Sequence, residues 1–113
     1  MNVKSVTQAQ VFDQTHFTKR ILFQEGEGTA FVLNFLPGQS LPPHRHPGSE
    51  VYLLVLQGKG RVQVDGREFA LHEHQALYCR GDEELRLDND GEEPLSLYVV
   101  LSRVPGSAYT QEI

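Results

Sequence analysis

The stretch "EVYLLVLQGKGRVQVDGREFAL", residues 50–71, decides the fold class. It begins with a continuous apolar run, and in "GRVQV" (60–64) the valines then fall on one side of an extended chain and the polar residues on the other. Alternation at a period of two predicts a β-strand. Asp65 and Gly66 follow, a residue pair that favours the positive φ angles of a two-residue hairpin turn. The stretch therefore predicts two antiparallel strands joined by a tight turn, preceded by a more buried strand.

The same alternation continues on both sides of this hairpin. "PGQSLPP" (37–43) interrupts it and predicts a turn followed by an extended loop, because proline has no N–H to donate to a sheet. No stretch shows the apolar period of an α-helix. Seven or eight short strands separated by turns predict an all-β antiparallel sandwich or barrel. The further candidate strands are residues 18–24, 30–36, 75–79, 84–88 and 95–102.

The predicted strand at residues 51–56 has no polar face. A strand in the outer wall of an isolated sandwich is normally wet on one side. Its second face must therefore meet either another copy of the chain or another segment of the same chain. We expect a homodimer, and coverage by the N-terminal segment is the open alternative. The tail at residues 103–113 is weakly patterned and is expected to lie over the surface.

Length, charge and cysteine content narrow the class of protein. The chain has 113 residues, the size of one small domain. Its net charge of −5, with scattered basic residues, argues against nucleic-acid binding. No apolar run is long enough to span a membrane, and no signal-peptide core is present. Cys79 is the only cysteine, which excludes an intrachain disulfide. We therefore expect a cytoplasmic protein.

His44 and His46 are the strongest candidate ligands for a metal ion. Residues two apart on a strand point the same way, so the two imidazoles can converge on one ion. Glu50 follows four residues later and joins them if the intervening turn preserves the alternation. Two imidazoles and one carboxylate suit Fe, Mn, Co, Ni, Cu or Zn and leave coordination positions open. Histidines beside a turn are also commonly solvated, and that alternative stays open on spacing alone.

The residues around this pair resemble the first motif of the cupin superfamily, which reads Gly, five residues, His, one, His, three or four, Glu, six, Gly. The chain has Gly38, five residues, His44, Arg45, His46, three residues and Glu50. The resemblance covers about residues 31–101. It implies one cupin domain over residues 1–113, a double-stranded β-helix or jelly-roll-like antiparallel barrel. Its core is expected at about residues 30–102, and residues 1–29 are expected to add N-terminal strands and dimer contacts.

The chain departs from the cupin pattern in two places. Seven residues separate Glu50 from Gly58 where the motif has six, so that counting back from Gly58 puts Val51 at the glutamate position. Because a slip of one residue exchanges the faces of a strand, either a β-bulge turns Glu50 inward or Val51 faces inward. We expect the bulge. The second motif reads Gly, five residues, Pro, one, Gly, two, His, three, Asn, and those positions here hold His74, Arg80, Asp82, Leu85 and Asn89.

The resemblance implies a pocket for a small-molecule ligand. The expected metal ligands are His44, His46 and Glu50, and Tyr52 and Leu85 are expected to line the pocket. We expect a divalent metal ion, and a metal-dependent oxygenase or isomerase if the protein is an enzyme. The alternative is a non-catalytic, metal-free cupin that acts as a ligand-binding, sensor or storage module. The sequence assigns no catalytic residue and no substrate.

Overall fold

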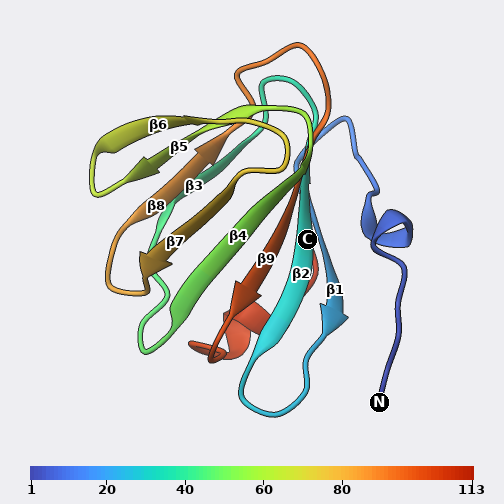
Figure 1. The fold of residues 1–113 in the computed structure, drawn as a ribbon, viewed down its shortest axis with the longest axis vertical. Coiled ribbons are helices and arrows are strands. Elements are labelled where there is room, and N and C mark those ends of the chain that lie inside the picture. Colours follow the sequence, from blue (N-terminus) through green and yellow to red (C-terminus); the bar gives the residue numbers. More distant parts are fainter.

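The computed structural model describes residues 1–113 and consists of two antiparallel β-sheets (Figure 1). The five-stranded sheet has the order β1-β2-β9-β4-β7, and the four-stranded sheet has the order β3-β8-β5-β6. Two short 3-10 helices, η1 (Val6–Ala9) and η2 (Ser107–Thr110), lie near the ends of the chain. The strands are β1 (Thr18–Phe23), β2 (Thr29–Phe35), β3 (Ser40–His44), β4 (Glu50–Gln57), β5 (Gly60–Val64), β6 (Arg67–Leu71), β7 (Ala76–Arg80), β8 (Leu85–Asp88) and β9 (Leu95–Leu101).

The all-β prediction is confirmed, and the structure adds one strand to the seven or eight expected. The added strand is β3, which falls in the proline-rich stretch that the sequence predicts to be a loop. β3 lies at the edge of its sheet and pairs only with β8. An edge strand tolerates proline because one side of its backbone has no neighbouring strand. Pro42 and Pro43 lack N–H groups, and this loss does not prevent β3 from pairing with β8.

The hairpin between β5 and β6 forms as predicted. Asp65 and Gly66 both have positive φ angles, 49° and 79°, as a two-residue turn with a right-handed twist requires. Val64 and Arg67 pair directly on either side of this turn. The alternation of the β5 side chains follows, with Val62 fully buried and Arg61 exposed.

The core lies between the two sheets. It is formed by the inward side chains of both, and no α-helix contributes to it. β4 illustrates the pattern, because Val51, Leu53 and Val55 are buried between the sheets whereas the residues between them point outward. The largest fully buried core side chains are Phe35, Leu87, Leu95, Leu97, Leu101, Val51, Val55 and Val62.

The N-terminal segment covers part of the outer face of the five-stranded sheet. Ala9 of η1 packs with Leu22 and Val32, and Leu56 and Tyr98 flank this small cluster. The fully buried Asn34 fixes the contact, because its side-chain nitrogen donates to the carbonyl oxygen of Ala9 at 2.8 Å. The chain itself thus covers one end of the apolar face that the sequence leaves without a partner.

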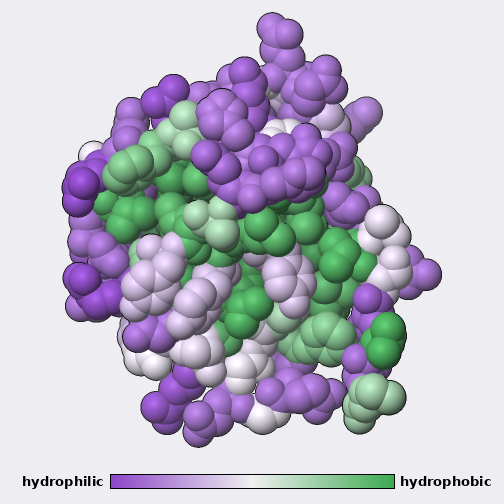
Figure 2. Space-filling model, viewed as in Figure 1, coloured by the Kyte–Doolittle hydropathy of each residue, from purple (hydrophilic) through white to green (hydrophobic).

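A second part of that outer face stays open. Tyr52, Leu54 and Tyr78 are 50%, 37% and 54% exposed, and they border a groove lined only by hydrophobic residues. Figure 2 shows hydrophobic residues gathered over the middle of the molecule, with hydrophilic residues around them. We call Tyr52, Leu54 and Tyr78 the outer apolar patch. The two helices, η1 and η2, have four residues each, so neither could span a membrane.

Candidate functional site

The two histidines of the motif lie at one end of the space between the sheets. His44 is the last residue of β3 and pairs with Leu85 of β8. The regular pairing of these two strands is interrupted between Leu41 and His44. His46 belongs to the turn that leads into β4, and Gly81 fixes its backbone. The His46 N–H donates to the Gly81 carbonyl oxygen, and the Gly81 N–H donates to the Ser49 carbonyl oxygen, both at 2.8 Å. The β3 edge and the turn before β4 therefore bring both side chains to the same place.

The imidazoles of His44 and His46 contact each other directly. Their Nε2 atoms are 2.9 Å apart, and the ring planes meet edge to face with centroids at 4.4 Å. Nδ1 of His44 lies 3.0 Å from the carbonyl oxygen of Pro42, which can only accept a hydrogen bond. The arrangement that satisfies most groups has His44 donating through Nδ1 and His46 donating through Nε2. Nδ1 of His46 is then a bare acceptor, and it has no hydrogen-bond partner although His46 is only 3% exposed.

Both imidazoles are neutral near pH 7. Burial lowers the pKa of His44 below its ordinary value, against the raising effect of the Pro42 carbonyl. Burial also lowers the pKa of His46 to about 4, with smaller contributions from the nearby His44 and Lys19. No carboxylate stands beside the pair to stabilise a protonated ring, so the pair accepts hydrogen bonds without carrying charge.

The histidines open into a cavity of about 200 Å³. Most of its wall is apolar and comes from both sheets, including Phe31, Leu33, Leu53, Leu85, Leu87 and Val99. The polar groups on the wall are the two histidines, Lys19 and Tyr109. A largely apolar cavity with a few convergent polar groups has the usual composition of a small-molecule site.

Lys19 is the charged residue of the cavity. Its side chain lies between β1 and the C-terminal segment, residues 104–113, and it is 6% exposed. The ammonium donates to the carbonyl oxygen of Tyr109 at 2.8 Å and lies 4.5 Å from the centroid of the Phe31 ring. Burial lowers the pKa of Lys19, and the more distant carboxylate of Glu112 partly opposes that effect.

The C-terminal segment forms part of the cavity wall. It follows β9 and is drawn in red near the arrowhead of β9 in Figure 1. The Ile113 carbonyl oxygen accepts the Lys19 N–H at 3.2 Å, the Tyr109 hydroxyl donates to the Arg45 carbonyl oxygen, and the Tyr109 ring lies 5.5 Å from that of His46. The sequence predicted only that this tail lies over the surface, and it did not predict the contacts with Lys19, Arg45 and His46.

Glu50 does not join the histidines, which corrects the expectation of an inward bulge. Its neighbour Val51 is fully buried in the core, and the Glu50 carboxylate accepts a hydrogen bond from the Tyr78 hydroxyl at 2.6 Å. That hydroxyl belongs to the outer apolar patch. β4 pairs with β7 without a bulge between Glu50 and Leu54, so the alternation starts with Glu50 pointing outward.

Of the two residues expected to line the pocket, Leu85 and Tyr52, only Leu85 does so. Leu85 is buried and lines the cavity beside His44. Tyr52 lies on the outer face, where its ring contacts that of Tyr78 with centroids 5.3 Å apart. Tyr52 lies two residues after Glu50 on β4 and therefore points outward as Glu50 does. The prediction that Tyr52 lines the pocket is wrong for the same reason.

Comparison with known proteins agrees with this architecture. Residues 31–101 match the family model described as a cupin domain. The chain belongs to the cupin family. This cupin domain has a TM-score of 0.86 and 24% identity with the TT1209 protein of Thermus thermophilus, a match that covers 91% of this chain and 98% of the other. At that level of identity the likeness shows the fold alone.

Two curated relatives are similar to this cupin in sequence. The tetracenomycin polyketide synthase protein TcmJ of Streptomyces glaucescens is 31% identical over 70 residues, which are 62% of this chain and 47% of TcmJ. The dimethylsulfoniopropionate lyase DddW of Ruegeria pomeroyi is 43% identical over 53 residues, which are 47% of this chain and 34% of DddW. The chain thus spans less than half the length of the curated relatives it matches.

The side chains of this cupin do not fit a resident divalent metal ion. Nowhere in the structure do three His, Cys, Asp or Glu side chains come together in a way that could hold one. The histidine pair offers two nitrogen donors, and the third and fourth family positions hold Val51 and Leu85, which cannot ligate. The Lys19 ammonium on the same cavity wall also repels a cation. Protein metal sites normally supply at least three ligands, so this donor set is too small.

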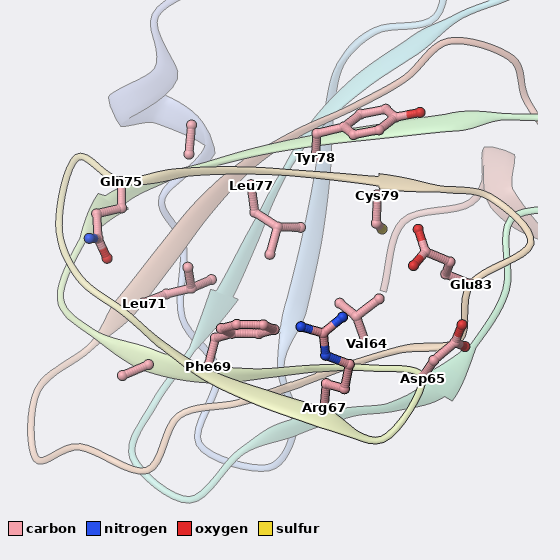
Figure 3. Close-up of a pocket in the computed structure, with 12 residues that line it drawn as sticks. Val64, Asp65, Arg67, Phe69, Leu71, Gln75, Leu77, Tyr78, Cys79 and Glu83 are labelled. Carbon is pink, nitrogen blue, oxygen red and sulfur yellow. The ribbon is translucent and has the colours of Figure 1, made fainter.

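A second cavity of the cupin barrel lies between β6 and β7, where the edges of the two sheets face each other without pairing (Figure 3). It is larger, about 570 Å³, and it contains no histidine. The Cys79 thiol is drawn pointing into it in Figure 3, yet Cys79 is only 3% exposed, and burial raises its pKa to about 11. Its lining combines apolar side chains with the charged residues Asp65, Arg67 and Glu83 (Figure 3).

Lys19 and Tyr109 are not among the site residues that the sequence predicts. A signal for Lys19 was available, because it lies two residues before Ile21, whose side chain packs on the core, so both share the inward face of β1. A lysine at such a position is ordinarily assumed to be exposed. Tyr109 lies in a segment without apolar periodicity, and no local pattern predicts its contact with His46.

Proposed function

We propose that this cupin binds a small organic molecule in the cavity beside His44 and His46, without a resident metal ion. The supporting observation is the bare Nδ1 of the buried His46, whose ring lines a largely apolar cavity. A buried polar atom without a partner costs free energy, which a bound molecule or an ordered water can recover.

The size of the cavity limits the ligand. An apolar protein cavity of about 150 Å³ accepts benzene. The cavity here, at about 200 Å³, therefore suits one six-membered ring or an aliphatic group of similar size, with a short polar substituent. The substituent would lie near the histidines and Lys19, because the rest of the wall is mostly apolar.

The relatives add a chemical context. One is a protein of a polyketide synthase and another is a lyase that acts on dimethylsulfoniopropionate, and both names concern small organic compounds. If this cupin is an enzyme, its cavity favours proton transfer. A neutral imidazole can accept a proton, and an ammonium group can stabilise the oxyanion that forms when a proton leaves the carbon next to a carbonyl.

Titration with benzamide and benzoate, followed by two-dimensional amide NMR, tests the binding proposal. We expect at least one of them to shift the signals of His44, His46 and Tyr109, and we expect His46→Leu to weaken that binding. His72→Ala is the matched control, because His72 is exposed and remote in sequence from the cavity. The proposal fails if neither compound shifts these signals, or if the shifts are the same in His46→Leu.

A divalent metal held by His44 and His46 is the competing function. The 2.9 Å separation of the two Nε2 atoms favours it, because both could face one ion. Metal analysis of protein purified after growth with added Fe, Mn, Ni, Co, Cu and Zn distinguishes the two. We expect substoichiometric metal that dialysis removes. Stoichiometric metal that survives dialysis and is lost in His44→Ala would support the metal site and overturn our proposal.

A further inference from the structure

The buried ammonium of Lys19 lacks a counter-charge. Lysine is rarely this buried unless it forms an ion pair, because an unpaired charge is costly in a dry interior. Here its nearest partners are one main-chain carbonyl, that of Tyr109, and the face of the Phe31 ring. Glu112 is the nearby acid, but its carboxylate accepts the main-chain N–H of Ile21 at 2.7 Å. No salt bridge joins Glu112 to Lys19, so the Glu112 charge acts on the Lys19 ammonium only from a distance and partly opposes the lowering of its pKa by burial.

The remaining hydrogen-bonding capacity of Lys19 lies at the cavity. An ammonium group has three donors, and the structure assigns one of them to Tyr109. The other polar side chains on the wall are two imidazoles and a tyrosine, and no carboxylate side chain lines the cavity. The side chains of the lining therefore carry one positive charge and no negative charge.

We propose that the ligand of this cavity is a small organic carboxylate, whose anionic oxygens pair with Lys19 while its apolar body packs against the wall. The proposal rests on the function proposed above and names the class of ligand. The carboxylate supplies the counter-charge that Lys19 lacks. Its two oxygens can take the two donors of the Lys19 ammonium that Tyr109 leaves free, and the apolar body contacts residues such as Leu53, Leu85 and Val99.

The geometry favours an anion over a neutral polar compound of equal size. A neutral ligand would leave the ammonium without charge compensation in a largely apolar cavity, whereas a carboxylate forms a charge-assisted hydrogen bond there. Such bonds are about twice as strong as those between neutral groups. The difference between two ligands of the same shape therefore isolates the contribution of charge.

Benzoate and benzamide form a matched pair for the test, since they differ mainly in the charge of one group. On the wild-type protein at neutral pH, we expect calorimetry or NMR titration to give benzoate at least about a tenfold lower Kd than benzamide. In Lys19→Met, which keeps much of the aliphatic stem against Phe31, we expect that preference to disappear. Lys59→Met is the control, because Lys59 is exposed outside the cavity, and it should keep the preference.

The outcomes separate this inference from the broader proposal. If both compounds bind the cavity with equal affinity in the wild type, the carboxylate inference is overturned and the binding function survives. If neither compound binds, the binding function itself fails. A preference for benzoate that persists in Lys19→Met would show that Lys19 does not recognise the charge. Thermal unfolding checks that the variant is folded, and Lys19→Gln serves as the second variant if Lys19→Met is not.

Discussion

Gly81 and His46 are packed so closely that no side chain fits between them. A Cβ atom on Gly81 would lie 2.0 Å from the His46 carbonyl oxygen and 2.3 Å from that of Ser49. Both contacts are with backbone, which cannot rotate away as a flexible side chain can. Only glycine therefore fits at position 81, because the turn that carries His46 occupies the space of a Cβ atom.

Gly81→Ala is expected to destabilise the fold and to displace His46. Overpacking of a buried site typically costs about 1–3 kcal/mol. The His46 ring should also move relative to His44, because the turn that carries it must shift. Urea unfolding measures the first effect, and the imidazole NMR signals measure the second. Gly91→Ala is the control, since a Cβ there meets only ordinary contacts at 3.5 Å. Equal stability of the two variants would contradict the prediction.

The histidine pair is expected to make the fold less stable in acid. The pKa of His46 falls from 6.5 to about 4 on folding, so between these values the unfolded chain binds more protons than the folded one. Stability is therefore full above pH 6.5 and decreases as the pH falls towards 4. The shift corresponds to about 3 kcal/mol for His46.

Urea unfolding at several pH values between 7 and 4 checks this expectation. The free energy of unfolding of the wild type should fall more steeply than that of His46→Leu, which lacks the titrating group. His72→Ala should follow the wild type. Parallel curves for the wild type and His46→Leu would show that burial does not perturb His46.

Cys79 is expected to be unreactive in the folded protein. Its thiol is buried and its pKa is raised to about 11, so almost no thiolate is present at neutral pH. An aromatic disulfide reagent at pH 7.5 should react slowly with the native chain and stoichiometrically in urea. Rapid reaction without denaturant would mean that the cleft between β6 and β7 opens to expose the thiol.

Leu85→His is expected to build the metal site that the chain lacks. Leu85 pairs with His44 across β3 and β8, and it lines the same cavity, so an imidazole there gives a third nitrogen donor beside the pair. Zinc titration should show binding in Leu85→His that exceeds wild-type binding by about tenfold or more. The double variant with His44→Ala should lose this gain. No gain in the single variant would indicate that the three rings do not converge.

The outer apolar patch is expected to pair with a second copy of the chain. The outer face of the four-stranded sheet carries ion pairs such as Arg61–Glu68 and Arg86–Asp88, whereas the groove beside the patch is lined only by hydrophobic residues. Leu54→Lys should shift the molar mass from dimer to monomer in light scattering after size exclusion. Arg61→Ala should leave the mass unchanged. A monomeric wild type would contradict the expectation.

The sequence predicted the parts of the structure that depend only on the alternation of inward and outward side chains along a strand. The hairpin at Asp65 and Gly66 and the inward valines of β5 required only local alternation and turn chemistry. The direction of Glu50 depended on how the turn at residues 47–49 enters β4, and a difference of one residue there reverses every side chain. Spacing alone left both directions open.

The cavity depended on contacts between residues far apart in the chain. Lys19 and Tyr109 meet across the cavity although 90 positions separate them in sequence. Neither residue belongs to a motif, and nothing in the periodicity of the tail predicts that it covers the histidines. Hydrophobic alternation shows which face of a strand is buried, but it does not show which distant segment covers that face.

The C-terminal segment should also affect how fast a ligand leaves the cavity. Main-chain and side-chain bonds tie it to Lys19, Arg20 and Ile21 along one strand. Tyr109 and Ile113 of this segment form part of the cavity wall, so an occupant loses part of its contacts whenever these bonds break. Weakening the bonds should therefore shorten the residence time of the occupant.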